Sequence, residues 1–489
     1  MIVFYNPWST PSPKKPLPMS LLAPASMLEG EVDYEIVDGN VLEDPVGRIL
    51  EIGRSRELTA IAVTVMPGPQ LTHAVPDSRR LKRELPGVPI IWGGYFPSHH
   101  ADIALSDDAV DFCVHGQGEL TFLELIRTLD RGGSLAHIDG LIYKEDGRIR
   151  RNPKRKLVPL DDLPDWPYHR LPMERYFHTH YLGDRVGAHH SSFGCPFACS
   201  FCAVVEMSSR RWVAQSPERV ETTLRHLQDE YGMDAVQFHD MDFFIHESRT
   251  AEVAERLERL RISWWALGRV DELMRYDDAT WQKMKRSGLK MIFCGAESGS
   301  NDVLKRMNKG GKASAELTLE LARRMKFYNI IPEFSFVVGN PPNPAKDLAD
   351  TFAFIRRLKF INPLTEIILY VYTPVAVDGS LYVDAREAGF EFPTTLDEWL
   401  TGSWRQFALR RDPGTPWLDT DVKSRVRNFE RVLNAYYPTA TDTSLTGFKR
   451  GILRLLGGWR YKLNFYAYPL ELSAFHHLFR YQRPETTGF

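Results

Sequence analysis

The amino-acid sequence predicts an α/β protein with a doubly wound, flavodoxin-like domain over residues 1–145 and a partial (β/α)6 barrel over residues 186–395. Three observations predict this class. Two series of short apolar runs alternate with amphipathic stretches, a charged and proline-rich connector separates them, and the residues after about 395 show no clear strand repeat. The connector covers 146–185, and the last segment, 396–489, is expected to be mainly helical.

Composition and charge exclude several classes of protein. The chain has 489 residues, of which 43% are hydrophobic and 25% are charged, as in globular proteins rather than disordered ones. The formal net charge of −2 gives no global basic field, so no nucleic acid is expected as a partner. No apolar run is long enough to span a membrane, and the start does not resemble a signal peptide. The expected location is therefore the cytoplasm.

The first series contains five predicted strands with helical stretches between them, such as Leu71–Leu85 and Glu119–Leu129. Strands joined by helical crossovers form a parallel sheet, and such sheets bind ligands at the carboxyl ends of their strands. The five strands are Ile2–Tyr5, Tyr34–Asp38, Ala60–Val65, Pro89–Trp92 and Phe112–Val114.

Glycines gather at these carboxyl ends. Gly93 and Gly94 follow the fourth strand, and Gly116 and Gly118, with Glu119 next to them, follow the fifth. Glycine lets the backbone approach a ligand closely, so these segments are candidate binding loops. The alternative is that they only form tight turns.

Two charged segments mark the connector. Arg148–Lys156 is a basic run, and Asp161–Pro167 is acidic and rich in proline. A basic run of this kind is more often a solvated hairpin than a phosphate site, which is the interpretation adopted.

The second series contains six predicted strands, which favours a partial barrel over a closed eight-stranded one. Barrel enzymes carry their chemistry on the loops at the carboxyl ends of the strands. The six strands are Ala188–Ser192, Ala235–His239, Ser263–Leu267, Met291–Cys294, Glu333–Val338 and Glu366–Tyr372.

The C-terminal region is rich in tryptophan and, from Lys449 to Arg483, in basic residues interleaved with apolar ones. This composition predicts helices that pack over the barrel mouth, where they would be a candidate lid. The alternative is peripheral contact of the basic tail with a membrane surface.

Three of the five cysteines, Cys195, Cys199 and Cys202, lie within eight residues in the loop after the first barrel strand. Three thiolates can bind three irons of a 4Fe–4S cluster and leave the fourth iron open for catalysis. A structural zinc would need a fourth ligand, for which His189 or His190 is near in sequence. Cys113 and Cys294 lie in apolar runs and are expected to be small buried side chains.

The CxxxCxxC spacing, with the aromatic Phe201 before the last cysteine, resembles the radical S-adenosylmethionine (SAM) superfamily. The resemblance covers roughly 186–375. It implies that the open iron chelates the amino and carboxylate groups of SAM. It also implies that an external one-electron reductant, of flavodoxin or ferredoxin type, drives cleavage to a 5′-deoxyadenosyl radical. Phe201 would lie against the adenine.

Polar or glycine residues after successive barrel strands fit the same resemblance. Asp240 and Asp242 would lie near the amino end of SAM, and Arg269 would pair with its carboxylate. The segment holding Glu297 and Ser298 would accept from the ribose, and Gly339 would lie near the adenine. The structural alternative is that the aspartates cap helices and that Arg269 pairs with another charge.

The N-terminal domain resembles the cobalamin-binding domain of cobalamin-dependent radical SAM proteins, through Trp92–Ser98, His115–Glu119 and its place ahead of the barrel. Thr64 and Met66 would then border the corrin or its nucleotide tail. Cobalamin mutases carry a cobalt-ligating histidine after the first strand, but Asn6–Lys15 has none. The resemblance therefore implies cobalamin bound without a lower histidine ligand, and no mutase mechanism.

Together the two resemblances imply C-methylation of an unactivated carbon of a small molecule, through methylcobalamin and a 5′-deoxyadenosyl radical. A second reading keeps the cofactors but performs an oxidative cyclisation or rearrangement, as in the anaerobic magnesium-protoporphyrin monomethyl ester cyclase. A third reading, from another class, is a non-catalytic iron–sulfur and SAM-binding sensor. The substrate is expected to be a small molecule, but its identity does not follow from the residues.

Overall fold

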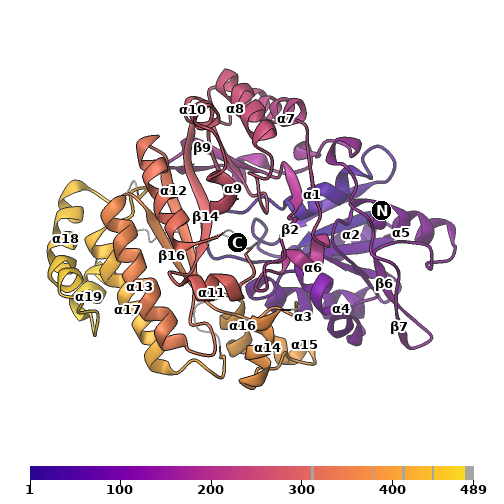
Figure 1. Cartoon of the computed structure of the whole chain (residues 1–489). Helices are drawn as coiled ribbons and strands as arrows, with labels where there is room; N and C mark the ends of the chain where they lie inside the picture. The colour runs from indigo at the N-terminus through magenta and orange to yellow at the C-terminus, as the bar shows by residue number, and fades with distance from the viewer. Residues whose placement is uncertain (310–312, 378, 410–413, 443–444, 479–489) are drawn as a thin grey trace.

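The computed structural model describes residues 1–309, 313–377, 379–409, 414–442 and 445–478. Two sheets, each covered by helices, lie side by side, and a group of C-terminal helices packs on the far side of the second (Figure 1). Residues 479–489, which include the end of the predicted basic tail, lie outside the described residues.

The first sheet has the strand order β2-β1-β3-β4-β5-β6-β7, and its first five strands are parallel. Helices α1 and α5 cover one face and α2, α3 and α4 the other, so the predicted flavodoxin-like fold is confirmed. The strands are β1 (Ile2–Asn6), β2 (Tyr34–Asp38), β3 (Ala60–Thr64), β4 (Ile90–Gly93), β5 (Phe112–Val114), β6 (Leu141–Glu145) and β7 (Arg148–Arg151), and the helices are α1 (Met19–Ser26), α2 (Pro45–Ser55), α3 (Pro69–Glu84), α4 (Tyr95–Ser106) and α5 (Glu119–Arg131).

The basic run after residue 145 begins as an edge strand. β7 pairs antiparallel with β6, and all four of its residues are exposed. This is the solvated hairpin expected from the charge pattern. The first sheet therefore continues to Arg151, and the connector beyond it contains short 3-10 turns at Leu160–Asp162, Tyr168–Arg170 and Met173–Arg175.

The second sheet has the order β16-β15-β14-β13-β12-β9-β8, and its six parallel strands form the predicted partial barrel. An antiparallel edge strand, β8, adds to it. The strands are β8 (His178–His180), β9 (Gly183–His189), β12 (Ala235–Phe238), β13 (Ser263–Arg269), β14 (Leu289–Glu297), β15 (Ile331–Val338) and β16 (Glu366–Val371), and the helices between them are α7 (Pro217–Tyr231), α8 (Glu247–Leu260), α9 (Val270–Leu273), α10 (Asp278–Arg286), α11 (Asn301–Arg306), α12 (Ala315–Phe327) and α13 (Pro344–Ile361).

The first barrel strand begins earlier than its predicted position at 188–192. β9 starts at Gly183, where the backbone N–H groups of Asp184 and Arg185 donate to the Asp234 carboxylate over 3.0 and 2.9 Å. The first half of β9 contains glycine and charged residues and so has no apolar pattern in the sequence. Its position is fixed instead by Asp234, which lies 49 residues from Arg185 in the sequence.

The C-terminal helices divide into two groups. α15 (Leu396–Trp399) and α16 (Gly402–Ala408) lie against the first domain, where the Trp399 ring meets the Phe96 ring at 5.3 Å. α17 (Thr420–Tyr436), α18 (Gly447–Lys462) and α19 (Leu470–Leu478) pack on the barrel, with Phe429 stacked on Phe352 at 3.8 Å. The predicted helical character of this region is confirmed, but α17, α18 and α19 pack on the outside of the barrel, with α17 against α13, and not over its mouth. Among the described residues no helix combines the length and apolar content needed to cross a bilayer.

Candidate functional site: the cysteine loop and two facing strand edges

The three clustered cysteines lie on a loop that a short β-ribbon holds in place. β10 (Ser192–Gly194) leads into the loop and pairs antiparallel with β11 (Trp212–Ala214), which leads out of it. Gly194 has φ +87°, and a Cβ there would lie 2.2 Å from the carbonyl oxygen of Arg211. Only glycine therefore fits directly before Cys195.

Further hydrogen bonds tie the loop to the segment after α11. The backbone N–H of Ser200 donates to the Met307 carbonyl over 3.0 Å, and the Asn308 amide donates to the Ala198 carbonyl over 3.1 Å. The loop is thus fixed at its ribbon and at its middle, which positions the thiols before any cofactor binds.

The three thiols fit an iron–sulfur cluster by their chemistry. Burial raises the pKa values of Cys195 and Cys199 well above the ordinary thiol value, and Cys195 lies close enough to Cys199 and Cys202 for their charges to add to the rise. Thiolates in such a place require a bound cation. Among the described residues, no three Cys, His, Asp or Glu side chains surround a position for a single metal ion. A 4Fe–4S cluster does not need such a position, because each thiolate binds a different iron.

The histidines proposed for a zinc alternative face other groups. His189 uses both ring nitrogens inside the protein, Nδ1 with the Tyr168 hydroxyl at 3.2 Å and Nε2 with Gln215 Oε1 at 2.9 Å. The His190 ring lies 6.5 Å from that of His239. The ring of His189 is therefore already committed, and it does not complete a four-ligand zinc set.

Asp242 is the most exceptional polar side chain near the cysteines. It is 1% exposed, and neither carboxylate oxygen accepts a hydrogen bond of good geometry from a described residue. Burial raises its pKa to about 7, and only the nearby Arg269 guanidinium and the Phe244 N–H oppose the rise. A buried carboxylate without a partner, beside Cys195, is suited to receive a cationic group of a ligand.

Asp240, two residues earlier, is already satisfied within the protein. Its carboxylate accepts from the Ser191 N–H at 3.1 Å, from the Ser191 hydroxyl at 2.8 Å and from the Ser192 hydroxyl. These bonds lock the ribbon to the carboxyl end of β12. Asp240 therefore supports the cysteine loop, whereas Asp242 is the carboxylate left open.

Arg269, at the end of β13, lies directly behind the cysteine loop. Its guanidinium is held in bidentate fashion by Asp271, with distances of 3.1 and 3.0 Å, and donates to the Cys199 sulfur at 3.3 Å. It also lies 3.6 Å above the Phe197 ring. The expected pairing with another charge is thus present, and a ligand carboxylate would have to share Arg269 with Asp271.

Glu297 and Ser298, at the end of β14, are joined to residues that the sequence did not indicate. Glu297 has φ +64° at an irregularity of the β14–β15 pairing, and its carboxylate forms a buried ion pair of 2.6 Å with Lys309. The Ser298 hydroxyl donates to Asp347 at 3.2 Å, and Asp347 also accepts from the Gly339 N–H at 2.9 Å. Asp347 therefore links the ends of β14 and β15.

Phe201 lies against the apolar wall formed by Met307, Val337 and Tyr372. Gly339 follows β15, to which Val337 belongs, and its carbonyl accepts from the Trp417 indole at 3.0 Å. Phe201 and Gly339, the two residues predicted to border the adenine, thus both lie near the carboxyl ends of β15 and β16. Their contact with SAM remains a prediction.

The candidate cobalamin residues follow neighbouring strands of the first sheet. Thr64 ends β3 and shares a 2.9 Å hydrogen bond with Ser20, while Met66 just beyond it is 42% exposed. Gly93 ends β4, where an added Cβ would meet nothing within 4 Å. Gly94 has φ +96°, and a Cβ there would lie 3.3 Å from Thr64 Oγ1. The sheet edge therefore has open space at Gly93.

The loop after β5 meets the cysteine loop. A Cβ on Gly116, which has φ +67°, would lie 2.6 Å from the carbonyl oxygen of Met207 on α6 (Val204–Ser208). Gly118 is tight against Val114, at 3.1 Å, and burial raises the pKa of Glu119 against the hydrogen bonds it accepts from backbone N–H groups. The carboxyl edges of both sheets thus meet at α6, which lies next to α4 (Figure 1).

Two histidines at this junction were not singled out from the sequence as site residues, although His115 opens the segment His115–Glu119 that carries the cobalamin-domain resemblance. Nε2 of His99 and Nε2 of His115 are buried and have no hydrogen-bond partner among the described residues. Burial lowers the pKa of His99 to about 4 and also lowers that of His115, so both are neutral at physiological pH. His115 lies 3.7 Å from Glu206 of α6.

Two family models match the chain. Residues 190–355 match the Radical SAM superfamily and residues 12–126 match the B12 binding domain. The fold and the cysteine loop therefore define an enzyme of the radical SAM superfamily. The chain belongs, more particularly, to the cobalamin-dependent radical SAM proteins, in which a B12-binding domain precedes the barrel. The predicted cofactors, a 4Fe–4S cluster, SAM and cobalamin, are confirmed at the level of these two domains.

Sequence and structure comparisons agree with this assignment. A methyltransferase of Pyrococcus horikoshii, described as uncharacterized, is 29% identical over 70% of this chain and 73% of its own length. The anaerobic magnesium-protoporphyrin IX monomethyl ester cyclase of Synechocystis is 25% identical over 59% of this chain, which spans about half (55%) of that enzyme. The methyltransferase TsrM from Kitasatospora setae, solved with tryptophan and a SAM analog, has a TM-score of 0.67 at 16% identity, with 98% of both chains covered, and shows the same fold.

One prediction follows from the unpartnered Asp242. Its raised pKa means that the folded protein holds a proton that the unfolded chain loses between about pH 4 and pH 7, so this group's contribution to stability falls as pH rises through that window. Asp242→Asn should therefore raise the Tm of the cluster-free protein at pH 8. The same change should weaken SAM binding by the cluster-loaded protein about 30-fold or more, because a buried ionic partner is lost.

Asp240→Asn is the matched control for Asp242→Asn. It breaks the bonds to Ser191 and Ser192 and should lower the Tm at every pH. Calorimetric titration with SAM and thermal scans at pH 5 and pH 8 measure both effects. Loss of stability at pH 8 in Asp242→Asn, with unchanged SAM affinity, would contradict the role assigned to Asp242.

Proposed function

We propose that this protein methylates an unactivated carbon of a small molecule, using cobalamin, SAM and a 4Fe–4S cluster on Cys195, Cys199 and Cys202. The observation that carries this proposal is the junction at α6, where the loop after β5 touches the cysteine loop at Gly116 and Met207. A substrate between the two edges would be within reach of both cofactors, as methyl transfer by this chemistry requires.

When bound, the cluster and SAM supply a radical that removes a hydrogen atom, and cobalamin supplies the methyl group. The side chains of this protein would bind SAM and orient it. Asp242 would receive the ammonium of SAM, and Arg269, held by Asp271, would take its carboxylate. Glu297 with Ser298 would face the ribose, and Phe201 and Gly339 would border the adenine. The fixed ribbon keeps the thiols in place throughout.

On the cobalamin side, backbone at Gly93, Gly94, Gly116 and Gly118 would approach the cofactor, with Thr64, Met66 and Glu119 at its border. The neutral side chains of His99 and His115 lie at the same junction. The described residues between β16 and α17 include α15 and α16 and reach from the barrel to the first domain, where Arg79 of α3 pairs with Asp397 at 2.7 Å. This segment would exclude water from the junction.

The similar proteins support methylation, and one of them supports cyclisation as the competing function. Two of the similar proteins named above are methyltransferases, and one is a cyclase. The cyclase reading shares the fold and both cofactors, so fold alone does not separate the two. Turnover with SAM labelled in its methyl group does, because only methylation carries the label into the product.

The partners follow from the same chemistry. The substrate would be a small molecule held between the two domains, and the electron would come from an external reductant of flavodoxin or ferredoxin type in the cytoplasm. No nucleic acid is expected, since the formal net charge of −2 gives no global basic field and basic residues of the 148–156 run pair with acidic side chains of the protein, Lys154 with Glu206 and Arg151 with Asp102.

A further inference from the structure

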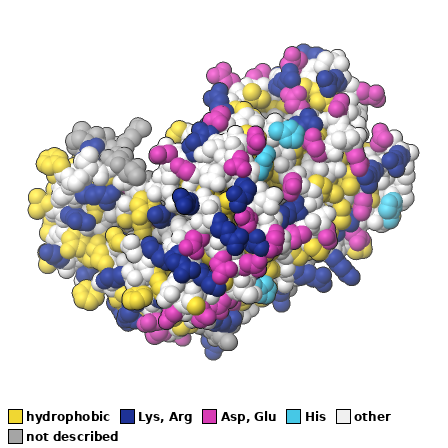
Figure 2. Space-filling view, turned by 90° about the horizontal axis from the view of Figure 1, so that it is seen from above, with side chains coloured by type: hydrophobic (Ala, Val, Ile, Leu, Met, Phe, Trp, Pro, Cys, Tyr) yellow, Lys and Arg dark blue, Asp and Glu magenta, His cyan; other side chains and the backbone are white. Residues whose placement is uncertain are grey.

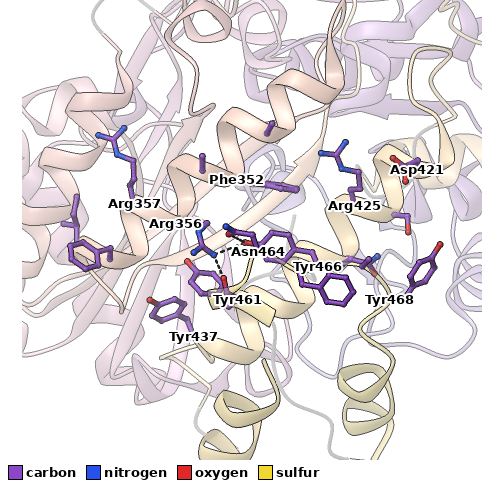
Figure 3. Close-up of a pocket in the computed structure, with 18 of the residues that line it drawn as sticks. Phe352, Arg356, Arg357, Asp421, Arg425, Tyr437, Tyr461, Asn464, Tyr466 and Tyr468 are labelled. Carbon is purple, nitrogen blue, oxygen red and sulfur yellow. Dashed lines mark hydrogen bonds between the residues drawn. The ribbon is translucent and has the colours of Figure 1, made fainter. Parts of the chain in front are cut away.

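A wide groove opens on the side of the barrel, away from the cysteine loop. It has a volume of about 1180 Å³ and lies between α13, α17 and the segment that follows α18 (Figure 3). Nothing in the proposed reaction uses it. Its lining combines aromatic rings, among them Phe360, Phe465 and Tyr468, with charged side chains.

The charge in this groove is strongly positive. Four arginines line it, Arg323, Arg356, Arg357 and Arg425, against a single acidic residue, Asp421. Arg323 pairs with Glu320 at 2.8 Å, and Arg356 donates to the Tyr466 hydroxyl at 2.9 Å and to the Tyr461 carbonyl (Figure 3). Arg357 and Arg425 are exposed, and neither forms a hydrogen bond or an ion pair within 4 Å with a described residue, although the charge of Arg357 acts on Glu316. Both guanidinium groups are therefore accessible to an anion.

An apolar ridge on α18 reaches the groove through Trp459, whose ring stacks at 5.7 Å on that of Phe465 in the groove lining. Phe448, Leu455 and Trp459 recur at spacings of seven and four residues, which places them on one face of α18. Phe448 and Leu455 are each 78% exposed, and Phe360 on the groove wall is 87% exposed. Leu463, Tyr468 and Leu470, which follow this face in the sequence, are exposed as well. Figure 2 shows hydrophobic and basic side chains intermingled at this end of the molecule.

Exposed apolar ridges of this extent mark interaction surfaces. A helix face with Phe, Leu and Trp beside cations suits the boundary between lipid headgroups and acyl chains, and clustered arginines attract anionic headgroups. A symmetric contact with a second copy would instead bring the accessible arginines of both copies toward the same interface. The charge therefore favours an anionic lipid surface as the occupant.

We propose that the end of the molecule formed by α13, α17 and α18 docks on an anionic membrane surface. The ridge of Phe448, Leu455 and Trp459 enters the headgroup boundary, and Arg357 and Arg425 hold lipid phosphate in the groove. Docking there leaves the junction at α6, on the other side of the barrel sheet, free for substrate. The proposal is independent of methyl transfer.

Co-sedimentation of the full-length protein with vesicles tests this. Vesicles of phosphatidylcholine with phosphatidylglycerol should bind the protein, and pure phosphatidylcholine vesicles should bind it far less. Arg357→Gln with Arg425→Gln should weaken binding about tenfold or more, since each cation near an anionic surface contributes on the order of 1 kcal/mol. Phe448→Ser with Leu455→Ser should weaken it as well, while added salt should reduce the wild-type binding.

The matched control removes two exposed arginines from helices of the first domain, Arg83→Gln on α3 and Arg131→Gln on α5. It should bind vesicles as the wild type does. Equal binding of wild type and groove variant, or an equal loss in the control, would overturn the proposal. So would displacement from vesicles by millimolar inorganic phosphate, which would mark a soluble-anion site. A dimer that the ridge variant dissociates, without vesicle binding, would identify a second copy as the occupant.

Discussion

Replacing Cys195, Cys199 or Cys202 by alanine, singly or together, is expected to abolish both iron binding and formation of 5′-deoxyadenosine. Three thiolates from one loop are the whole protein ligand set, and an incomplete set does not hold the cube. The wild type, purified without oxygen, should contain about four irons and four sulfides per chain. Iron and sulfide analysis, with chromatography of the SAM cleavage products, measures the effect.

Cys113 and Cys294 provide the control. Both are fully buried on strands, Cys113 on β5 and Cys294 on β14, and neither belongs to the cysteine loop. Their replacement by alanine should leave iron content unchanged, with only a loss of packing. If Cys113→Ala lost the iron while Cys199→Ala retained it, the cluster would be assigned to the wrong residues.

The second large effect concerns Gly93, at the carboxyl end of β4. Gly93→Leu is expected to prevent cobalamin binding while leaving the apo fold intact. A Cβ at this position meets no atom within 4 Å, and the backbone has an ordinary φ, so the leucine would occupy the open edge where the cofactor is expected. Absorbance of cobalamin retained after reconstitution and desalting measures binding, and a thermal scan measures the fold.

Gly87→Leu is the matched control, because Gly87 also has free space around it but precedes β4 at the opposite edge of the sheet. It should retain cobalamin fully. Gly94→Leu is a poorer probe, since φ +96° and the contact with Thr64 would strain the fold itself. Full cobalamin retention in Gly93→Leu would place the cofactor elsewhere on the protein.

Much of this architecture was predictable because it has local signals. Ten of the eleven predicted strands were placed at or within a few residues of those in the structure, since buried parallel strands form continuous apolar runs. The cysteine spacing predicted the cluster loop directly. Glycines at strand ends predicted a binding edge on the first sheet; the structure places open space at Gly93 and the Met207 carbonyl against Gly116, and contact with cobalamin stays a prediction.

What escaped prediction depends on contacts between distant residues. The ribbon of β10 and β11 has three residues on each strand, too short for a periodic pattern. Lys309 reaches Glu297 from a glycine-rich segment, and Asp347 reaches Ser298 and Gly339 from the first turn of α13. The positions of Lys309 and Asp347 in the sequence do not predict these contacts. Asp240 and Asp242 look equivalent in sequence. Only the structure shows that Asp240 accepts hydrogen bonds that support the cysteine loop, whereas the Asp242 carboxylate is left open for a ligand.

Turnover with SAM whose methyl group carries deuterium, together with cobalamin, a reductant and candidate small molecules under exclusion of oxygen, tests methylation most directly. Methylation by this protein predicts a product heavier by one labelled methyl group in place of hydrogen, with both S-adenosylhomocysteine and 5′-deoxyadenosine formed. An unlabelled product that has lost hydrogen or gained oxygen, formed with 5′-deoxyadenosine alone, would contradict it and indicate cyclisation.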